Sequence, residues 1–251
     1  MTTISIITPV FNGASTIGQC LQSIDRQTFK NVEHIIIDAA STDATLAIIE
    51  GMSSPSRQVL SEPDKGIYDG MNKGLLRATG DIVGILNADD MYCDVNVLQD
   101  VCDTFMHSGV ASCYGDLEYV DFYDTSKVVR LWKSGKFSPG KFRWGWMPPH
   151  PTFFVTRQLY ERYGAFNQQL GTAADYELML RLLVRYRVSV QYIPRVLVKM
   201  RNRGASNSTL RRRLLANQMD RKAWKINGLH PLPWTHICKP LRKLGQWVVK
   251  E

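Results

Sequence analysis

The sequence lacks any apolar run of roughly 18 residues, the minimum for a helix that spans a membrane. Its first residues, Met1-Thr2-Thr3, lack the basic start of a secretory signal. Its five cysteines form no CxxC pair, and their odd number argues against a disulfide framework. We therefore expect reduced thiols and a cytoplasmic protein that is either soluble or peripheral on a membrane.

Repeats, low-complexity tracts and linkers rich in glycine, serine or proline are also missing, so one domain followed by a tail is the simplest organisation. With 251 residues, 44% apolar and 22% charged content, the chain can bury one sizeable α/β core. This composition excludes a disordered or fibrous protein.

Acidic residues are scarce in the last quarter of the chain. From Arg187 onward 15 basic residues accompany two acidic ones, a net charge of +13 within an overall +8, so the preceding residues carry −5. A basic terminal segment favours an anionic partner, which could be a diphosphate, an acidic lipid or a nucleic acid. The charge alone does not choose among these three.

Hydrophobic periodicity predicts that strands and amphipathic helices alternate in the first half of the chain. Apolar, β-branched runs predict strands at 3–10, 32–38, 57–61 and 81–87. Apolar residues at helical spacing predict helices at 15–28, 42–52 and 67–78. This alternation is typical of a doubly wound parallel sheet that is covered by helices on both faces.

The pattern is less regular after Asp90. We expect a helix at 95–106, short strands at 111–119 and 127–132, an aromatic loop at 135–149, a strand at 152–155, helices at 157–163 and 174–186, and short strands at 189–193 and 196–200. This half should therefore be mixed, and a basic helical tail follows it.

Polar residues follow each of the first four predicted strands, and ligands of open α/β sheets bind at these carboxyl ends. Asp89 and Asp90 follow a strand too apolar to be exposed, and two adjacent carboxylates repel each other unless a cation lies near them. Mg²⁺ or Mn²⁺ together with a nucleotide diphosphate would supply that charge. A turn before the next helix explains the pair equally well.

Asp38 and Lys65 lie at the same predicted edge. Asp38 closes the second strand, where its carboxylate can accept from a nucleobase or a ribose hydroxyl or can simply brace its own loop. Lys65 precedes the helix at 67–78, and both an ammonium and a helix N-terminus favour phosphate. A solvated lysine is the alternative.

Four segments carry a joint signature: SIITPVFN at 5–12, IIDAASTDAT at 36–45, EPDKGIYDGMNKG at 62–74 and NADD at 87–90. Together they resemble glycosyltransferase family 2, and especially the bacterial branch that builds colanic acid, O-antigen and other surface polysaccharides. The resemblance runs from residue 3 to about residue 205.

The resemblance implies a GT-A fold over residues 1–205, in which 1–110 bind the nucleotide sugar and 111–205 form a mixed acceptor half. Residues 206–251 remain as a basic helical tail. The implied activity is an inverting transfer of a sugar, usually from a UDP-sugar, to a hydroxyl of a polyprenyl-diphosphate-linked saccharide.

By the same resemblance, the donor site comprises Thr8, Pro9, Phe11, Asp38, Lys65, Asn72, Asn87, Ala88, Asp89 and Arg203. The metal motif falls on 87–90, with Asp89 as the ligand of Mg²⁺ or Mn²⁺ and Asp90 as its neighbour or substitute. Asn87 stands where a leading aspartate is frequent, and Ala39 stands where a second aspartate often follows Asp38.

The family's catalytic carboxylate falls on Asp175, at the start of a predicted helix. A helix N-terminus keeps a carboxylate ionised, which suits a general base, although a plain helix cap would look the same. Trp144, Trp146 and His150 precede a strand that faces the acceptor in the family, and aromatic faces suit sugar rings. A packed loop would explain these three residues nearly as well.

The tail holds Trp224, Trp234 and Trp247 among basic residues, a pattern typical of a segment that rests on anionic lipid. We expect it to bind the cytoplasmic face of the inner membrane, and packing on the domain explains the pattern equally well. We do not expect nucleic acid as a partner.

Two other functions fit parts of the pattern. A sugar nucleotidyltransferase shares the α/β plan, but the Gly-rich Arg-x-x-Pro-x-x-Lys loop expected after its first strand is missing. A non-catalytic basic scaffold or nucleic-acid-binding protein would not need Asp38, Asp89 and Asp175 together.

Overall fold

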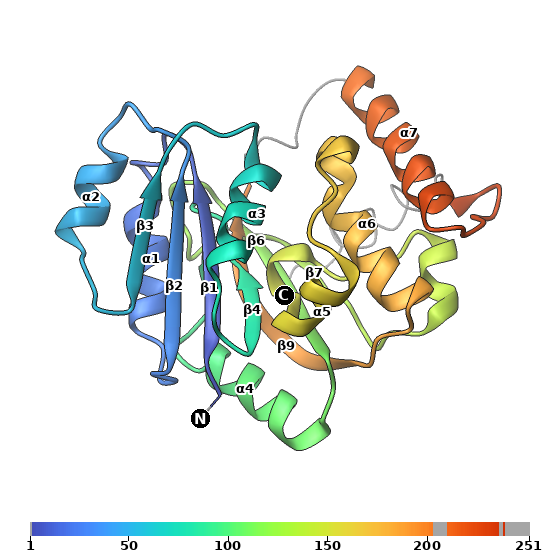
Figure 1. The fold of residues 1–251 in the computed structure, drawn as a ribbon, viewed down its shortest axis with the longest axis horizontal. Coiled ribbons are helices and arrows are strands. Elements are labelled where there is room, and N and C mark those ends of the chain that lie inside the picture. The colour runs from blue at the N-terminus through green and yellow to red at the C-terminus, as the bar shows by residue number, and fades with distance from the viewer. Residues whose placement is uncertain (1, 203–209, 236–237, 239–251) are drawn as a thin grey trace.

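The computed structural model describes residues 2–202, 210–235 and 238, and Figure 1 shows one twisted sheet with helices on both faces. The strand order is β3-β2-β1-β4-β8-β6-β9-β5, and β7 pairs with β6 at the side. Among the described residues, no helix combines the length and the apolar character that crossing a bilayer demands. All five cysteines are free thiols.

The first half of the chain forms the expected parallel part of the sheet. It contains β1 (Ile4–Val10), β2 (Val32–Asp38), β3 (Arg57–Ser61) and β4 (Ile82–Ile85), with α1 (Ile17–Asp25), α2 (Thr45–Gly51) and α3 (Ile67–Arg77) between them. Alternate residues of β1 face opposite sides, so Ile6 packs in the cluster of α1 while Ile7 packs in the cluster of α3. Burial on both faces explains why this strand is apolar throughout.

The second half is mixed, as expected. Its strands are β5 (Asp90–Tyr92), β6 (Ser112–Val120), β7 (Val128–Trp132), β8 (Phe154–Thr156) and β9 (Val190–Arg201). Strands β6 and β9 are parallel, and the other pairings in this half are antiparallel. The helices are α4 (Val97–Ser108), α5 (Arg157–Tyr163) and α6 (Ala174–Leu180), with short helical turns η1 (Pro139–Trp144), η2 (His150–Thr152), η3 (Gln168–Ala173) and η4 (Arg181–Arg185).

One local prediction was wrong, and one strand was not predicted. Residues 190–201 form one strand where two were expected, and 90–92 form the strand β5, which replaces the turn offered as one explanation of Asp89 and Asp90. The register of β9 shifts between Tyr192 and Val196, around Pro194, because proline has no N–H to donate to the sheet. The expected helix at 174–186 is confirmed as α6 followed directly by the wider helical turn η4.

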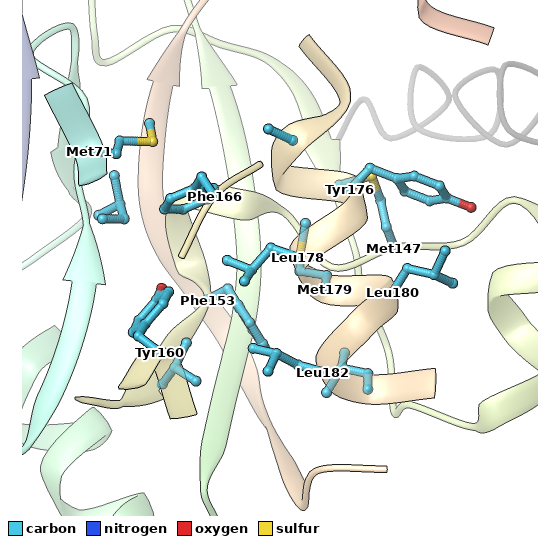
Figure 2. Packing of buried hydrophobic residues seen from close by; sticks show 14 of the residues in the cluster. Met71, Met147, Phe153, Tyr160, Phe166, Tyr176, Leu178, Met179, Leu180 and Leu182 are labelled. Carbon is cyan, nitrogen blue, oxygen red and sulfur yellow. The ribbon is translucent and has the colours of Figure 1, made fainter. Parts of the chain in front are cut away.

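The core of the second half of the chain lies around α6. Figure 2 shows Leu178 of this helix and Leu182 of η4 among the buried side chains of Phe153, Tyr160 and Phe166. The same cluster continues onto the parallel half through Met71 of α3. The two halves therefore share one continuous core.

The described part of the tail packs on this core. Helix α7 (Leu210–Ile226) contacts α6 and η3, and its residues Ala223 and Trp224 are buried in the same cluster. The helical prediction for the tail is confirmed over α7, but Trp224 cannot rest on lipid because it is only 1% exposed. Trp247 and most of the residues after 235 lie outside the described part of the chain.

Candidate functional site

The loops after β1 and β2 are locked together at the carboxyl edge of the sheet. The N–H of Asn12 donates to the hydroxyl of Ser41 at 2.8 Å, and the Asn12 side-chain oxygen accepts from the N–H of Thr42 at 2.9 Å. Asn12 and Ala40 both have the positive φ of the left-handed region, which these bonds must stabilise. The edge is therefore built as a fixed surface, with Phe11 63% exposed on it.

Asp38 lies buried beneath this edge. Its side chain is fully buried, and Oδ2 accepts from the N–H of Ser41 at 3.0 Å and from the Ser61 hydroxyl at 2.6 Å. Oδ1 has no hydrogen-bond partner within the described part of the chain. A buried carboxylate oxygen without a donor is a natural acceptor for a nucleobase N–H or a ribose hydroxyl.

Thr8 and Pro9, predicted at the donor site, have buried side chains. The Thr8 hydroxyl hydrogen-bonds the ring of His34 at 3.0 Å inside the sheet, so this side chain braces the fold. Lys65 is exposed just before α3, and its own N–H donates to Asp69 at 3.0 Å, which fixes the helix start. Its ammonium is thus placed at the positive end of α3.

The predicted metal motif separates into a buried and a partly exposed carboxylate. Asp90 is fully buried in β5, and the Asn87 amide donates to its Oδ2 at 3.1 Å. Asp89 is partly exposed at the tip. Burial raises the pKa of Asp89, and burial together with the charge of Asp89 raises the pKa of Asp90 well above its usual range. Only Asp89 of the two can reach a cation at the surface.

Ala88 is buried at this edge and faces Gly13 of the first loop. A Cβ on Gly13 would make an ordinary contact with the Ala88 methyl, at 3.6 Å, but would lie only 2.7 Å from Cγ2 of Val10, closer than side chains allow. Glycine at position 13 therefore makes room for Val10.

Arg201 contacts the predicted metal motif, although no feature of the sequence pointed to it. Its side chain is 3% exposed and donates to the carbonyl of Asp89 at 2.6 Å, to the Phe122 carbonyl at 3.2 Å and to Gln19. Its positive charge opposes the pKa increase of Asp89 and of Asp90. Arg203, the arginine chosen from the sequence, lies outside the described residues.

Register pairing places four residues in one row across the sheet. Met200 of β9 pairs with Asp90 on one side and with Tyr119 on the other, and Tyr119 pairs with Arg130 of β7. The Arg130 guanidinium lies 3.5 Å above the centre of the Tyr119 ring. Burial raises the pKa of Tyr119, and the charges of Asp90 and Asp175 raise it further. Tyr119 therefore lies within electrostatic reach of both carboxylates.

Asp175 begins the first turn of α6 and is partly exposed. The N–H of Tyr176 donates to its Oδ1 at 2.7 Å. Burial raises the pKa of Tyr68 in α3, and the charge of Asp175 raises it further because the two side chains interact directly. His150 is also close: burial lowers its pKa, the charge of Asp175 opposes this, and its Nε2 has no partner among the described residues.

The two tryptophans predicted to bind the acceptor differ in exposure. Trp146 is 3% exposed, donates through Nε1 to the Ser134 carbonyl at 2.8 Å and packs edge-on against Tyr114, so it is a core residue and the acceptor prediction for it was wrong. Trp144 is 52% exposed and packs on Trp234 with the ring centres 5.6 Å apart. It keeps an aromatic surface open to a ligand.

Asn72 does not face the donor edge as predicted. Both polar atoms of its amide are bonded at 2.9 Å to the backbone of Phe166, in the loop between α5 and η3. The side chain therefore joins the two halves of the protein.

Within the described residues, no three His, Cys, Asp or Glu side chains are grouped closely enough to hold a metal ion. A nucleotide-bound Mg²⁺ or Mn²⁺ needs less, because one or two carboxylates suffice when substrate phosphates and water fill the remaining positions. Asp89 and the unpartnered Oδ1 of Asn87 fit such an ion in chemistry.

Comparison with known sequences supports a transferase. Residues 5–163 match the family described as Glycosyl transferase family 2. The chain is 30% identical over 209 residues to a PGL/p-HBAD biosynthesis glycosyltransferase of Mycobacterium bovis, covering 82% of this chain and 79% of that protein. It is 27% identical over 181 residues to a chondroitin synthase of Pasteurella multocida, covering 71% of this chain and 18% of that protein. These relatives do not single out the surface-polysaccharide branch.

Solved structures confirm the expected GT-A fold. The mannosyltransferase PcManGT from Pyrobaculum calidifontis, solved with GDP-Man and Mn²⁺, aligns with a TM-score of 0.66 at 21% identity, covering 96% of this chain and 68% of that one. Residues 1–349 of Staphylococcus aureus TarS, solved with UDP, align with a TM-score of 0.62 at 15% identity, covering 89% and 72%. The chain spans only 39% of a longer TarS structure.

Proposed function

The chain belongs to glycosyltransferase family 2 and is a glycosyltransferase, and from this premise we propose that it transfers a sugar with inversion from a nucleoside diphosphate sugar to an acceptor hydroxyl. The observation that carries the proposal is the place of Asp175, which is partly exposed in the first turn of α6 with its Oδ1 held by the N–H of Tyr176 at 2.7 Å, in a chain whose residues 5–163 match the family.

Asp175 is the proposed general base. It accepts the proton of the acceptor hydroxyl while that oxygen forms a bond to the anomeric carbon and the bond from this carbon to the diphosphate oxygen breaks. The diphosphate leaves with the bonding electron pair, so one proton and one sugar have moved.

Other residues bind and orient the donor in this proposal. The free Oδ1 of Asp38 accepts from the base or ribose, and Lys65 with the start of α3 attracts the diphosphate. Asp89 and Asn87 hold Mg²⁺ or Mn²⁺, which supplies positive charge to the leaving diphosphate when it is bound. UDP-sugars are the proposed donors; TarS has been solved with UDP-GlcNAc and PcManGT with GDP-Man.

We propose that the acceptor is a lipid-linked saccharide and that the transfer takes place at the cytoplasmic face of the inner membrane. The basic last quarter of the chain supports attraction to anionic lipid. Among the described tail residues, Trp234 is the exposed tryptophan, and it lies beside the exposed Trp144.

The test is turnover of UDP-glucose, UDP-GlcNAc and GDP-mannose, measured as nucleoside diphosphate release with a panel of alkyl glycosides as acceptors. Asp175→Asn should lower turnover by about 10²–10⁴-fold, the usual contribution of a general base, while UDP binds as before. Asp103→Asn, an exposed aspartate of α4, is the matched control. Full turnover by Asp175→Asn would refute the proposed role.

A further inference from the structure

The end of helix α7 is bonded directly to the two residues that follow Asp175. The Trp224 indole N–H donates to the Tyr176 hydroxyl at 2.8 Å. The Asn227 amide donates to Oε1 of Glu177 at 2.9 Å. Both donors are buried, with Trp224 1% and Asn227 5% exposed. The tail therefore contacts the helical turn that carries the proposed base.

Glu177 extends this contact, through Arg181, to the loop between α5 and η3. It is 2% exposed and pairs with Arg181, whose Nε lies 3.1 Å from its Oε1. Arg181 in turn donates to the carbonyls of Gly164 at 3.0 Å and Ala165 at 2.7 Å. A buried ion pair with this many hydrogen bonds holds a defined geometry, and losing one partner is costly.

Helix α6 depends on contacts with its neighbours because it is short and no regular α-helix continues it at either end. It has seven residues, and the preceding segment contains Gly171 in a non-helical conformation with φ 49 and ψ −129. It continues into the wider turn η4 instead of a regular helix. The direction of its first turn is therefore set by what packs against it, which includes α7.

We infer that Trp224 and Asn227 are positioning residues that hold Asp175 at the angle and distance needed to accept the acceptor proton. The inference rests on the proposed role of Asp175. Displacements of about 1 Å are enough to slow a proton transfer strongly, so two buried hydrogen bonds at residues 176 and 177 can control the rate without touching substrate. On this inference α7 contributes to catalysis as part of the transferase domain. A contact between the tail and a membrane would then be made by residues other than Trp224 and Asn227.

The experiment compares Asn227→Leu and Trp224→Phe, each of which removes one donor and keeps most of the side-chain volume. The readouts are kcat for the sugar nucleotide that turns over, the dissociation constant of UDP, the pH profile of kcat and Tm. We expect kcat to fall about tenfold or more and the acidic limb of the profile to shift, while UDP affinity stays within about twofold.

Two controls separate positioning from plain destabilisation. Lys222→Ala changes the exposed face of α7 and should leave all four readouts unchanged, and Ile49→Val lowers Tm from a buried site in α2. The inference is overturned if both test variants keep wild-type kcat, or if their UDP affinity falls together with kcat and Tm. It is also overturned if Ile49→Val loses as much kcat as the test variants for the same loss of Tm. Asp175→Asn separates failure of the inference from failure of the proposed function. If Asp175→Asn turns over normally, the assignment of Asp175 as the base fails. If Asp175→Asn is inactive while both tail variants are fully active, only the inference is refuted.

Discussion

The side-chain amide of Asn72 forms two hydrogen bonds with the backbone of Phe166. It accepts from the Phe166 N–H and donates to the Phe166 carbonyl, each at 2.9 Å. These two residues are 94 positions apart, one in α3 of the donor half and one in the acceptor half. The Phe166 ring lies against Tyr68 and His150, with ring centres 5.6 and 6.2 Å away. Both of these side chains adjoin Asp175, so the two hydrogen bonds of Asn72 tie α3 to the surroundings of the proposed base.

Asn72→Ala should therefore weaken folding and transfer while sparing the donor edge. It leaves the N–H and carbonyl of Phe166 without their partners, which should cost about 1–3 kcal/mol in the free energy of unfolding by urea. We expect kcat to fall and UDP affinity to stay unchanged. Asn31→Ala removes two hydrogen bonds from an exposed asparagine and should cost less than about 1 kcal/mol. Loss of UDP binding by Asn72→Ala would show that its amide serves the donor instead.

Metal dependence should follow Asp89 and not Asp90. Chelation with EDTA, and equally Asp89→Asn in the presence of Mn²⁺, should weaken UDP binding by about tenfold or more, because the diphosphate then lacks a shared cation. Asp90→Asn should keep the affinity within about twofold, since this buried side chain faces Asn87. Calorimetric titration of UDP checks all three. Metal-independent binding by the wild type would contradict the assignment.

Most of the parallel half was predictable because β1, β2 and β4 are largely buried on both faces, so their sequences are apolar runs ended by polar residues. Asp38 and Asp89 could be chosen for the same reason: the ends of parallel strands meet at one edge. Strand β5 could not, because three residues carry no periodicity and its pairing partner, β9, is about a hundred residues away along the chain.

Arg201, Tyr119 and Arg130 could not be predicted for the same reason, the pairing of strands that are distant along the chain. Their places in the site depend on the β5–β9–β6–β7 pairing, which no local pattern encodes. Trp146 was misassigned for a different reason: an aromatic residue in a loop looks alike in sequence whether it packs in the core or faces a sugar. Its burial, the Ser134 carbonyl bonded to its indole and its contact with Tyr114 place Trp146 in the core.

The two neighbouring tryptophans should respond in opposite ways to truncation. Trp146→Ala should lower the free energy of unfolding by about 3–5 kcal/mol, because it empties a buried aromatic cluster. Trp144→Ala should cost about 1 kcal/mol or less and should instead raise the acceptor KM if its exposed ring contacts sugar. Urea unfolding and acceptor titration measure the two effects. Equal stability losses would contradict the burial difference.

His34 should make the protein less stable in mild acid. Its ring is buried between the Thr8 hydroxyl, 3.0 Å from Nε2, and Arg57, whose Nε donates to Nδ1 at 3.3 Å. Burial, helped by the charge of Arg57, lowers the pKa of His34 to about 3. The unfolded chain takes up this proton below about pH 6.5, whereas the folded chain does not until about pH 3. Stability is therefore complete above pH 6.5 and is lost as the pH falls through this window.

The size of the loss follows from proton linkage, at about 1.4 kcal/mol for each pH unit below 6.5. Between pH 7.5 and 4.5, the wild type should lose about 3 kcal/mol more than His34→Gln, which cannot take up the proton and can still bond both neighbours. Urea unfolding at the two pH values gives this double difference, in which groups common to both proteins cancel. A value near zero for His34→Gln would mean that the buried ring takes up the proton in the folded state as readily as in the unfolded chain, so that burial does not lower its pKa.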